Sequence, residues 1–326
     1  EPADEAGYMK LLAHSKALYD VGFTELADRP FGTPWSMVRH IPSLLRLRSD
    51  RTVWQLVSHH LKSPKLRQAF SIQPLLVGGN PFSTTAVYAL IAQLERRHGV
   101  HFAMGGTGSL VKGMVSLIES QGGQVRCNAQ VKQILVEERR AAGVELDSGE
   151  QLRADVVVSN ADSAATYRYL VPKQHRRRWT DRKLNRARYS MSLFVWYFGT
   201  DRRYEDVPQH SVLLGPRYKG LLDDIFSHKR LADDFSLYLH RPTATDPSLA
   251  PEGCDTFYVL APVPNFARGE IDWETEAPRF RDRILEYVEK RYIPGLRDDL
   301  VTSHMFTTRD FVTELNAHQG AAFSLQ

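Results

Sequence analysis

The sequence predicts an α/β fold in which a helical N-terminal region is followed by a mixed region and then by a second, largely antiparallel sheet. Apolar residues in the first part of the chain recur at helical spacing, short apolar runs alternate with glycine turns in the middle, and aromatic-rich runs separated by loops follow. The chain has 326 residues, of which 42% are hydrophobic and 25% charged. It is therefore long enough to bury a sizeable core, and its composition excludes disordered, collagen-like and coiled-coil proteins.

Residues 1–98 are predicted to form the helical region. Helix-compatible runs lie at 3–20, 35–47, 52–61 and 64–70. After the turn at 78–81, a further helix is predicted to begin at Ser83. Its apolar stripe has i, i+3, i+4 and i+7 spacing and consists of Val87, Leu90, Ile91 and Leu94.

The pattern changes at Gly99, and residues 99–189 are predicted to form a βαβ unit with an attached β-meander and a basic helical segment. The helix of this unit is expected to begin at Ser109 as N-cap and to end at Gln121, with an apolar stripe of Leu110, Met114, Leu117 and Ile118. Strands are predicted at 100–104, 125–127, 131–138, 141–146 and 154–159. The last run is continuously β-branched or small, which is typical of a strand covered on both faces.

Residues 190–326 are predicted to form a separate domain around the antiparallel sheet. Strands are expected at 191–198, 235–240, 256–261 and 301–307, with a helix at 274–291 and a short helix near Phe311. The run at 191–198 is apolar on both faces. It is therefore either buried on both sides or lines an apolar cavity.

The net charge of +4 is modest, but one segment concentrates positive charge. Between Arg176 and Arg188, seven Lys or Arg stand against the single Asp181. Nucleic acid is not expected as a partner, because aromatic residues are not regularly interleaved and no RNA- or DNA-binding motif accompanies the charges. An anionic membrane surface fits better, with Trp179 and Tyr189 at the level of the lipid headgroups. The alternative is an ordinary solvated face.

Several common sites are missing from the sequence. There is no GxGxxG dinucleotide fingerprint, no phosphate-binding loop, no metal-ligand spacing and no apolar run long enough to span a bilayer. Membrane contact must then be peripheral, and the amphipathic run at 35–47 is a second candidate for it. The two cysteines, Cys127 and Cys254, are too few for a disulfide framework, which favours a reducing compartment.

Seven segments together resemble the bacterial phytoene desaturases. They lie at 66–71, 75–82, 105–111, 122–123, 157–162, 235–240 and 249–253. The resemblance covers essentially the whole chain and implies an FAD-dependent carotenoid desaturase of amine-oxidase-like architecture. Its parts would be a Rossmann-like FAD-binding domain, here residues 99–189, an inserted substrate-binding domain at 190–326 and a helical membrane-associating region at 1–98. Because the chain starts at Glu1 without Met, we expect it to be the middle of a longer protein whose flavin fingerprint precedes it.

The resemblance also implies site residues. The expected flavin contacts are Gly105, Gly106, Val131, Ser159, Asn160 and Ala161. Arg39 is the catalytic candidate, because residues 35–39 match a family helix that faces the substrate cavity; a surface cation is the alternative. The implied partners are FAD, phytoene and partly desaturated carotenoids, and an anionic membrane surface.

The resemblance further implies a cytoplasmic protein that is peripherally attached to the bacterial inner membrane, with a homo-oligomer left open. Two alternatives to phytoene desaturation remain. The first is another carotenoid flavoprotein: a ketolase, an isomerase or a C30 desaturase. The second is a non-catalytic, peripheral membrane-binding module, for which the basic segment is the direct support.

Overall fold

The computed structural model describes residues 1–26, 28, 35, 38, 40–267 and 271–326. These residues form two compact units. Unit 1 comprises residues 1–101 together with 216–223, and unit 2 comprises residues 102–215 together with 224–326. Along the described parts of the chain, no helix is both long and apolar enough to cross a membrane.

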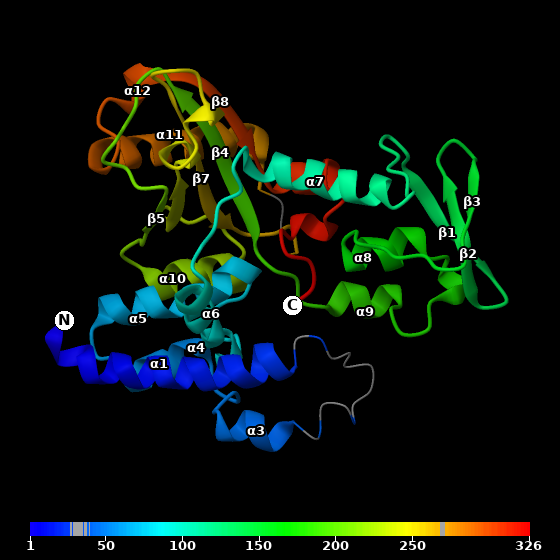
Figure 1. The fold of residues 1–326 in the computed structure, drawn as a ribbon, viewed down its shortest axis with the longest axis horizontal. Helices are drawn as coiled ribbons and strands as arrows, with labels where there is room; N and C mark the ends of the chain where they lie inside the picture. The colour runs from blue at the N-terminus through cyan, green and yellow to red at the C-terminus, as the bar shows by residue number, and fades with distance from the viewer. Residues whose placement is uncertain (27, 29–34, 36–37, 39, 268–270) are drawn as a thin grey trace. The chain divides into compact units, whose positions relative to one another are not determined.

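Unit 1 is helical (Figure 1). Its helices are α1 (Glu5–Tyr19), α3 (Ile41–Arg46), α4 (Val53–His60), α5 (Pro64–Ser71), α6 (Leu90–His98) and α10 (Tyr218–Asp223). Short helical turns are η1 (Pro2–Asp4), η2 (Asp20–Glu25), η3 (Gln73–Val77) and η4 (Ala86–Ala89). A small core joins α1 to α4 through Leu11, Val53, Val57 and Leu61. The helices predicted at 3–20, 52–61 and 64–70 are confirmed.

The helix predicted from Ser83 begins later. The amides of Ser83 and Thr84 donate to the carbonyl of Asn80 and so belong to the preceding turn. Thr85 then caps η4 through its hydroxyl, and the regular helix starts only at Leu90. Of the run predicted at 35–47, α3 covers residues 41–46, and residues 36–37 and 39 lie outside the described part of the chain.

Unit 2 contains two antiparallel sheets. The first is a meander of β1 (Val131–Glu137), β2 (Arg140–Leu146) and β3 (Gln151–Arg153). The second has the strand order β5-β6-β7-β4-β8 and consists of β4 (Ser192–Thr200), β5 (His210–Leu213), β6 (Leu237–His240), β7 (Asp255–Val263) and β8 (Leu300–Phe306). The strand predictions for 131–138, 141–146, 191–198, 235–240, 256–261 and 301–307 are thereby confirmed.

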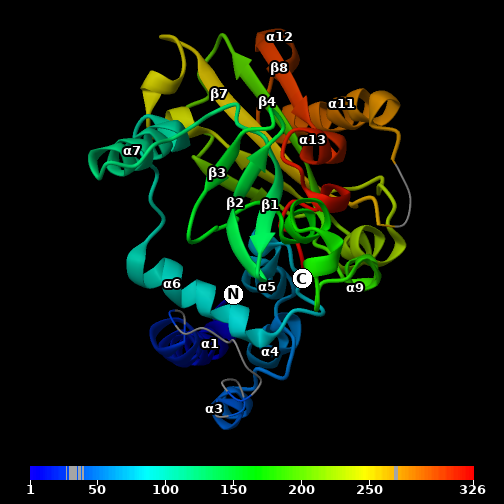
Figure 2. The same cartoon turned by 90° about the vertical axis from the view of Figure 1, so that its right-hand side faces the viewer.

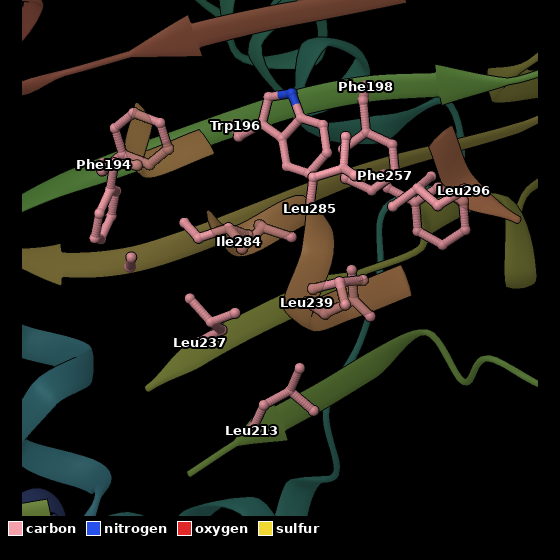
Figure 3. Close-up of a cluster of buried hydrophobic side chains, with 14 of the residues drawn as sticks. Phe194, Trp196, Phe198, Leu213, Leu237, Leu239, Phe257, Ile284, Leu285 and Leu296 are labelled. Carbon is pink, nitrogen blue, oxygen red and sulfur yellow. The ribbon is translucent and has the colours of Figure 1, made fainter. Parts of the chain in front are cut away.

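One face of the five-stranded sheet is buried under α11 (Trp273–Arg291), which lies against it in both views (Figures 1 and 2). Asp272 caps this helix by accepting the amide of Glu274. Figure 3 shows the rings of the sheet meeting aliphatic side chains of the helix. The residues in this contact include Phe194, Trp196, Phe198, Phe257, Ile284 and Leu285.

The apolar run at 191–198 divides between the two faces of β4, because successive side chains on a strand point in opposite directions. Phe194, Trp196 and Phe198 enter the core under α11. Val195 and Tyr197 point to the other face, where Val195 is 6% and Tyr197 45% exposed. The second face of this sheet is thus only partly covered within unit 2.

The other long helix of unit 2 is α7 (Gly106–Ser120). The short helices are α8 (Ser163–Ala165), α9 (Asp181–Arg186), α12 (Leu296–Asp299) and α13 (Thr308–Thr313). Helical turns are η5 (Thr166–Leu170), η6 (Lys173–His175), η7 (Asp224–His228), η8 (Pro242–Ala244), η9 (Pro247–Leu249) and η10 (His318–Gly320). Helix α13 confirms the prediction near Phe311.

Three predicted strands are wrong: residues 100–104, 125–127 and 154–159 form no strand in the structure, so the predicted βαβ unit is not formed by the described residues. A strand needs a neighbour for its amide and carbonyl groups, and the small sheet ends with β1 and β3. Val156 and Val158, predicted to be covered on both faces, are 73% and 87% exposed.

Candidate functional site

Unit 2 contains a cavity of about 730 Å³ between β1, the loop at 157–161 and the segment at 312–319. This volume lies in the range of pockets that hold small molecules and cofactors. The walls are largely apolar and include Val131, Ile134, Val144, Val157, Leu170 and Val312. The polar lining includes Lys132, Asp147, Ser159, Asn160, Asn316, His318 and Gln319. Such a site offers apolar contact to a flat ring system and hydrogen bonds to its polar substituents.

Four of the residues predicted as flavin contacts meet in this cavity. Val131 comes from the first position of β1, and Ser159, Asn160 and Ala161 come from the loop that precedes α8. The loop is held at its end by Asp162, whose carboxylate accepts the amide of Ala165 at 2.8 Å and so starts α8.

Within that loop, the hydroxyl of Ser159 shares a 2.7 Å hydrogen bond with the hydroxyl of Thr166. The contact ties the cavity wall to η5. The backbone from 157 to 161 is thereby placed along the cavity without being part of a strand.

The segment at 316–319 was missed by sequence reasoning. Asn316 and Gln319 have left-handed φ angles of 52° and 57°, so the chain bends sharply after α13. The bend turns His318 and Gln319 toward the cavity, where His318 Nε2 and Gln319 Oε1 are buried and have no hydrogen-bond partner among the described residues. An asparagine in a loop was the only local signal, because no periodic pattern marks this segment.

The surroundings of His318 disfavour protonation of its ring. Burial is the main cause that lowers its pKa, and the positive charge of Arg168 adds to the effect. Its ring packs against Tyr189 with the centroids 5.0 Å apart. Buried polar atoms in proteins normally have partners. The two unpartnered atoms at 318 and 319 are therefore available to a ligand, and they fit the edge of a nucleotide better than a hydrocarbon.

Gly105 and Gly106 do not line this cavity. They begin α7, with left-handed φ angles of 78° and 75°. The amide of Gly105 donates to the carboxylate of Asp246 at 2.6 Å, and the hydroxyl of Ser109 donates to the carbonyl of Gly105. Helix α7 thus starts at Gly106, and the prediction of Ser109 as N-cap is wrong because the glycine turn takes that place.

The carboxyl of Asp246 is kept charged by its surroundings. Hydrogen bonds from Ser248, and then from the amide of Gly105, lower its pKa. Asp246 is 3% exposed, so the glycine turn is tied to a buried anion. Arg39, the catalytic candidate, lies outside the described residues.

The basic segment, residues 176–188, is only partly exposed. Arg176 is almost completely buried and its guanidinium pairs with Asp181 at 2.6 Å. The ammonium of Lys183 lies 4.1 Å from the ring centroid of Trp179. Tyr189, expected at a membrane surface, is 5% exposed and donates to the carbonyl of Leu184, so that expectation is wrong. The exposed arginines are Arg177, Arg178, Arg182, Arg186 and Arg188.

The apolar stripe of α7 is exposed in unit 2. Its residues Leu110, Met114, Leu117 and Ile118 are 44–59% exposed. An exposed apolar stripe of this kind is typical of a surface that another segment or molecule covers. Among the described residues, no group of three or more His, Cys, Asp or Glu is arranged to hold a metal ion.

Comparisons with known proteins give consistent results. The model of the family described as "Flavin containing amine oxidoreductase" matches residues 12–320. The chain is 49% identical over 325 residues to the lycopene-forming phytoene desaturase of Paracoccus sp., covering 100% of this chain and 65% of that protein. It is 44% identical over 329 residues to the neurosporene-forming phytoene desaturase of Cereibacter sphaeroides, covering 100% of this chain and 63% of the relative.

The chain therefore spans slightly less than two thirds of the length of these relatives. Among solved structures, an oxidoreductase from Methanosarcina mazei superposes with a TM-score of 0.59 at 18% identity, covering 86% of this chain and 61% of that one. At this identity the structural match bears on the fold alone.

Proposed function

The chain belongs to the flavin-containing amine oxidoreductase family, and from this membership we propose that the whole protein is an FAD-dependent phytoene desaturase. The observation that carries the proposal is the 44–49% identity, over the entire chain, to desaturases that form lycopene or neurosporene. Such an enzyme removes hydrogen from adjacent saturated carbons of a C40 hydrocarbon and lengthens its conjugated system.

The bound flavin would supply the two-electron oxidation. The cavity of unit 2 fits the nucleotide part of this cofactor. Val131 and the neighbouring apolar wall would contact a flat ring, and the loop at 159–161 would follow the polar part of the molecule. The unpartnered His318 Nε2 and Gln319 Oε1 support this placement, since both atoms need hydrogen-bond partners in a buried site.

Gly105 and Gly106 remain proposed as a second flavin contact. Glycine at a left-handed turn exposes backbone that a ligand can approach closely, and both residues have left-handed φ angles. Their link to Asp246 fixes the turn. Arg39 remains a proposed catalytic residue on the resemblance alone.

The substrate offers neither charge nor hydrogen-bonding groups. Its recognition must come from buried apolar surface, which contributes about 25 cal/mol per Å². The chain's own part in the reaction is then to bind and orient a long hydrocarbon and to exclude water from the carbons that react.

We also propose peripheral attachment to the cytoplasmic face of an anionic membrane, through the basic segment and the helical region at 1–98. The exposed arginines of the basic segment support this, because each cation near an anionic bilayer contributes about 1 kcal/mol. A membrane-dissolved substrate would favour such an attachment.

We further propose that the remaining third of the whole protein covers the exposed α7 stripe and the exposed valines at 156 and 158. Both surfaces are apolar. Covering them would also supply the missing neighbours of the loop at 154–159.

The proposal is tested by expressing the whole protein in cells that accumulate phytoene. The expected outcome is loss of phytoene and formation of a coloured polyene with a three-peaked visible spectrum. Product mass distinguishes this outcome from ketolation or from action on a C30 chain. Colourless cells that retain phytoene while containing folded, flavin-loaded protein would refute the assignment.

A further inference from the structure

The face of the five-stranded sheet opposite α11 carries one ring from each strand in a single row. The pairing register places His210 of β5 beside His240 of β6, and His240 beside Tyr258 of β7. It then places Tyr258 beside Tyr197 of β4, and Tyr197 beside His304 of β8. These five residues are called the aromatic ladder below.

The rings of the aromatic ladder are in contact along the whole row. In the order of the strands, neighbouring ring centroids lie 4.9, 4.7, 5.8 and 6.2 Å apart. The rings of His210 and His240 are nearly parallel, with an interplanar angle of 8°. Since neighbouring strands are about 4.8 Å apart, the row extends over about 19 Å. This is an elongated surface, suited to a long ligand.

The next row on the same face consists of apolar and tyrosine side chains. They are Val212, Tyr238, Leu260, Val195 and Phe306. Tyr238 joins the two rows, because its hydroxyl lies 2.6 Å from Nδ1 of His210 and its ring centroid lies 5.7 Å from that of Tyr258. Neither row contains a carboxylate, a lysine or an arginine, whereas a solvated sheet face usually carries charges.

His240 is buried in this surface. It is 6% exposed, and neither Nδ1 nor Nε2 has a hydrogen-bond partner among the described residues. Burial, and secondarily the neighbouring His210, lowers the pKa of His240 to about 4, while burial also lowers the pKa of His210. The ring of His240 is therefore neutral at physiological pH, and burial disfavours the charged form of His210. A surface without charge complements a ligand without charge.

Leaving a half-exposed aromatic ring of this face in water costs free energy, because its apolar surface stays hydrated. Tyr197 is 45% exposed, although it stands in the centre of a strand that is otherwise buried. A contiguous aromatic surface of this kind, without lysine, arginine or carboxylate, is characteristic of a binding face.

We propose that the aromatic ladder binds an uncharged polyene and prefers a long conjugated system to a short one, so that partly desaturated products stay bound for further rounds. The inference rests on the proposed desaturase function. Aromatic faces gain stacking energy from a flat π-system beyond the burial of area, whereas a saturated chain gains from burial alone. The aromatic ladder would thus increase the number of double bonds that are introduced before the product dissociates.

The test compares Tyr197→Leu with Tyr197→Phe in the whole protein. Tyr197 is chosen because its exposure makes loss of folding a small risk, and thermal unfolding checks this. Binding is measured without turnover, by quenching of protein fluorescence with lycopene and, by displacement of lycopene, with phytoene. We expect Tyr197→Leu to weaken lycopene binding about tenfold and to leave phytoene binding nearly unchanged, because only the stacking contribution is lost. Tyr197→Phe should bind both as wild type does.

The matched control is Tyr292→Leu. Tyr292 is a 39% exposed ring of the same unit that lies outside the aromatic ladder, and its replacement should change neither affinity. In turnover, Tyr197→Leu should release products with fewer double bonds, while Tyr197→Phe and Tyr292→Leu should not. Folded Tyr258→Leu should likewise release products with fewer double bonds.

Equal lycopene affinity of Tyr197→Leu and Tyr197→Phe would overturn the inference. So would equal affinity of the wild-type protein for lycopene and phytoene, even if phytoene were converted normally. Failure of the proposed function is seen separately, as absence of phytoene turnover in flavin-loaded wild-type protein.

Discussion

Acidification should destabilise unit 2 through His240, and the size of the effect follows from its surroundings. The ring is 6% exposed, packs on His210 and Tyr258, and has no hydrogen-bond partner among the described residues. Its pKa is lowered from 6.5 to about 4, mainly by burial and further by His210. The folded state therefore resists protonation, while the unfolded chain accepts a proton near pH 6.5.

The sign of the effect is fixed by this difference. The contribution of His240 is fully present above pH 6.5 and is lost as the pH falls toward 4, because the unfolded chain then binds the additional proton. Between pH 8 and pH 5, a pKa of 6.5 in the unfolded state against about 4 in the folded state corresponds to a loss of about 2 kcal/mol. This is a substantial fraction of the stability of an ordinary domain.

The assay is urea unfolding of wild type and His240→Phe at pH 8 and pH 5, followed by fluorescence of the tryptophans in unit 2. The phenylalanine keeps a ring at this position and loses no hydrogen bond, so at pH 8 the two proteins should be similarly stable. At pH 5 the wild type should lose about 2 kcal/mol more than the variant. His59→Gln, at an exposed histidine of unit 1, is the control and should behave as wild type. Parallel pH profiles for wild type and His240→Phe would refute the reasoning.

Three further outcomes are expected. Gly105→Ala should lower the flavin content and should destabilise α7 by at least about 1 kcal/mol, because a Cβ in this left-handed turn would lie 2.2 Å from the Ser109 hydroxyl. Gly108→Ala, inside α7 with open space around it, should keep the flavin and stabilise the helix by about 0.5–1 kcal/mol. Val131→Phe should fill part of the cavity and weaken FAD retention, measured by flavin absorbance after gel filtration; undiminished FAD retention would exclude that cavity as the flavin site. Replacing Arg177 and Arg178 by Glu should weaken binding to anionic vesicles, measured by co-sedimentation, by at least tenfold and should leave binding to neutral vesicles unchanged. Equal binding of the variant and the wild type to anionic vesicles would argue against attachment through the basic segment.

Elements stabilised by near neighbours in the chain could be predicted from local patterns. Helix α11 carries Phe280, Ile284 and Val288 at four-residue spacing, and all three are buried under the sheet. The β1–β2 hairpin follows from two apolar runs joined by a short turn. The apolar side chains of the hairpin pack against the next strand in the sequence, and those of α11 pack against the five-stranded sheet.

Predictions failed where an element depends on a distant or absent neighbour. The run at 154–159 has the composition of a buried strand, yet forms none, because no described strand pairs with it. The start of α7 was placed at Ser109, because the hydrogen bond from Gly105 to Asp246 joins positions 141 residues apart and leaves no mark in the local sequence.

The residues of the candidate site likewise divide into those that the sequence predicted and those that only the structure revealed. Family resemblance pointed to Val131 and the loop at 159–161, which meet in one cavity, but nothing in the sequence indicated that His318 and Gln319 complete its wall.

Residue order along the chain was enough to assign the family, to locate the main strands and helices and to nominate part of a cofactor pocket. Only the folded chain decided which side of each strand faces α11, and hence that His210, His240, Tyr258, Tyr197 and His304 form one row. The reason is that strand register arises from pairing between segments far apart in the sequence, and a shift of one residue would turn every one of these rings to the opposite face.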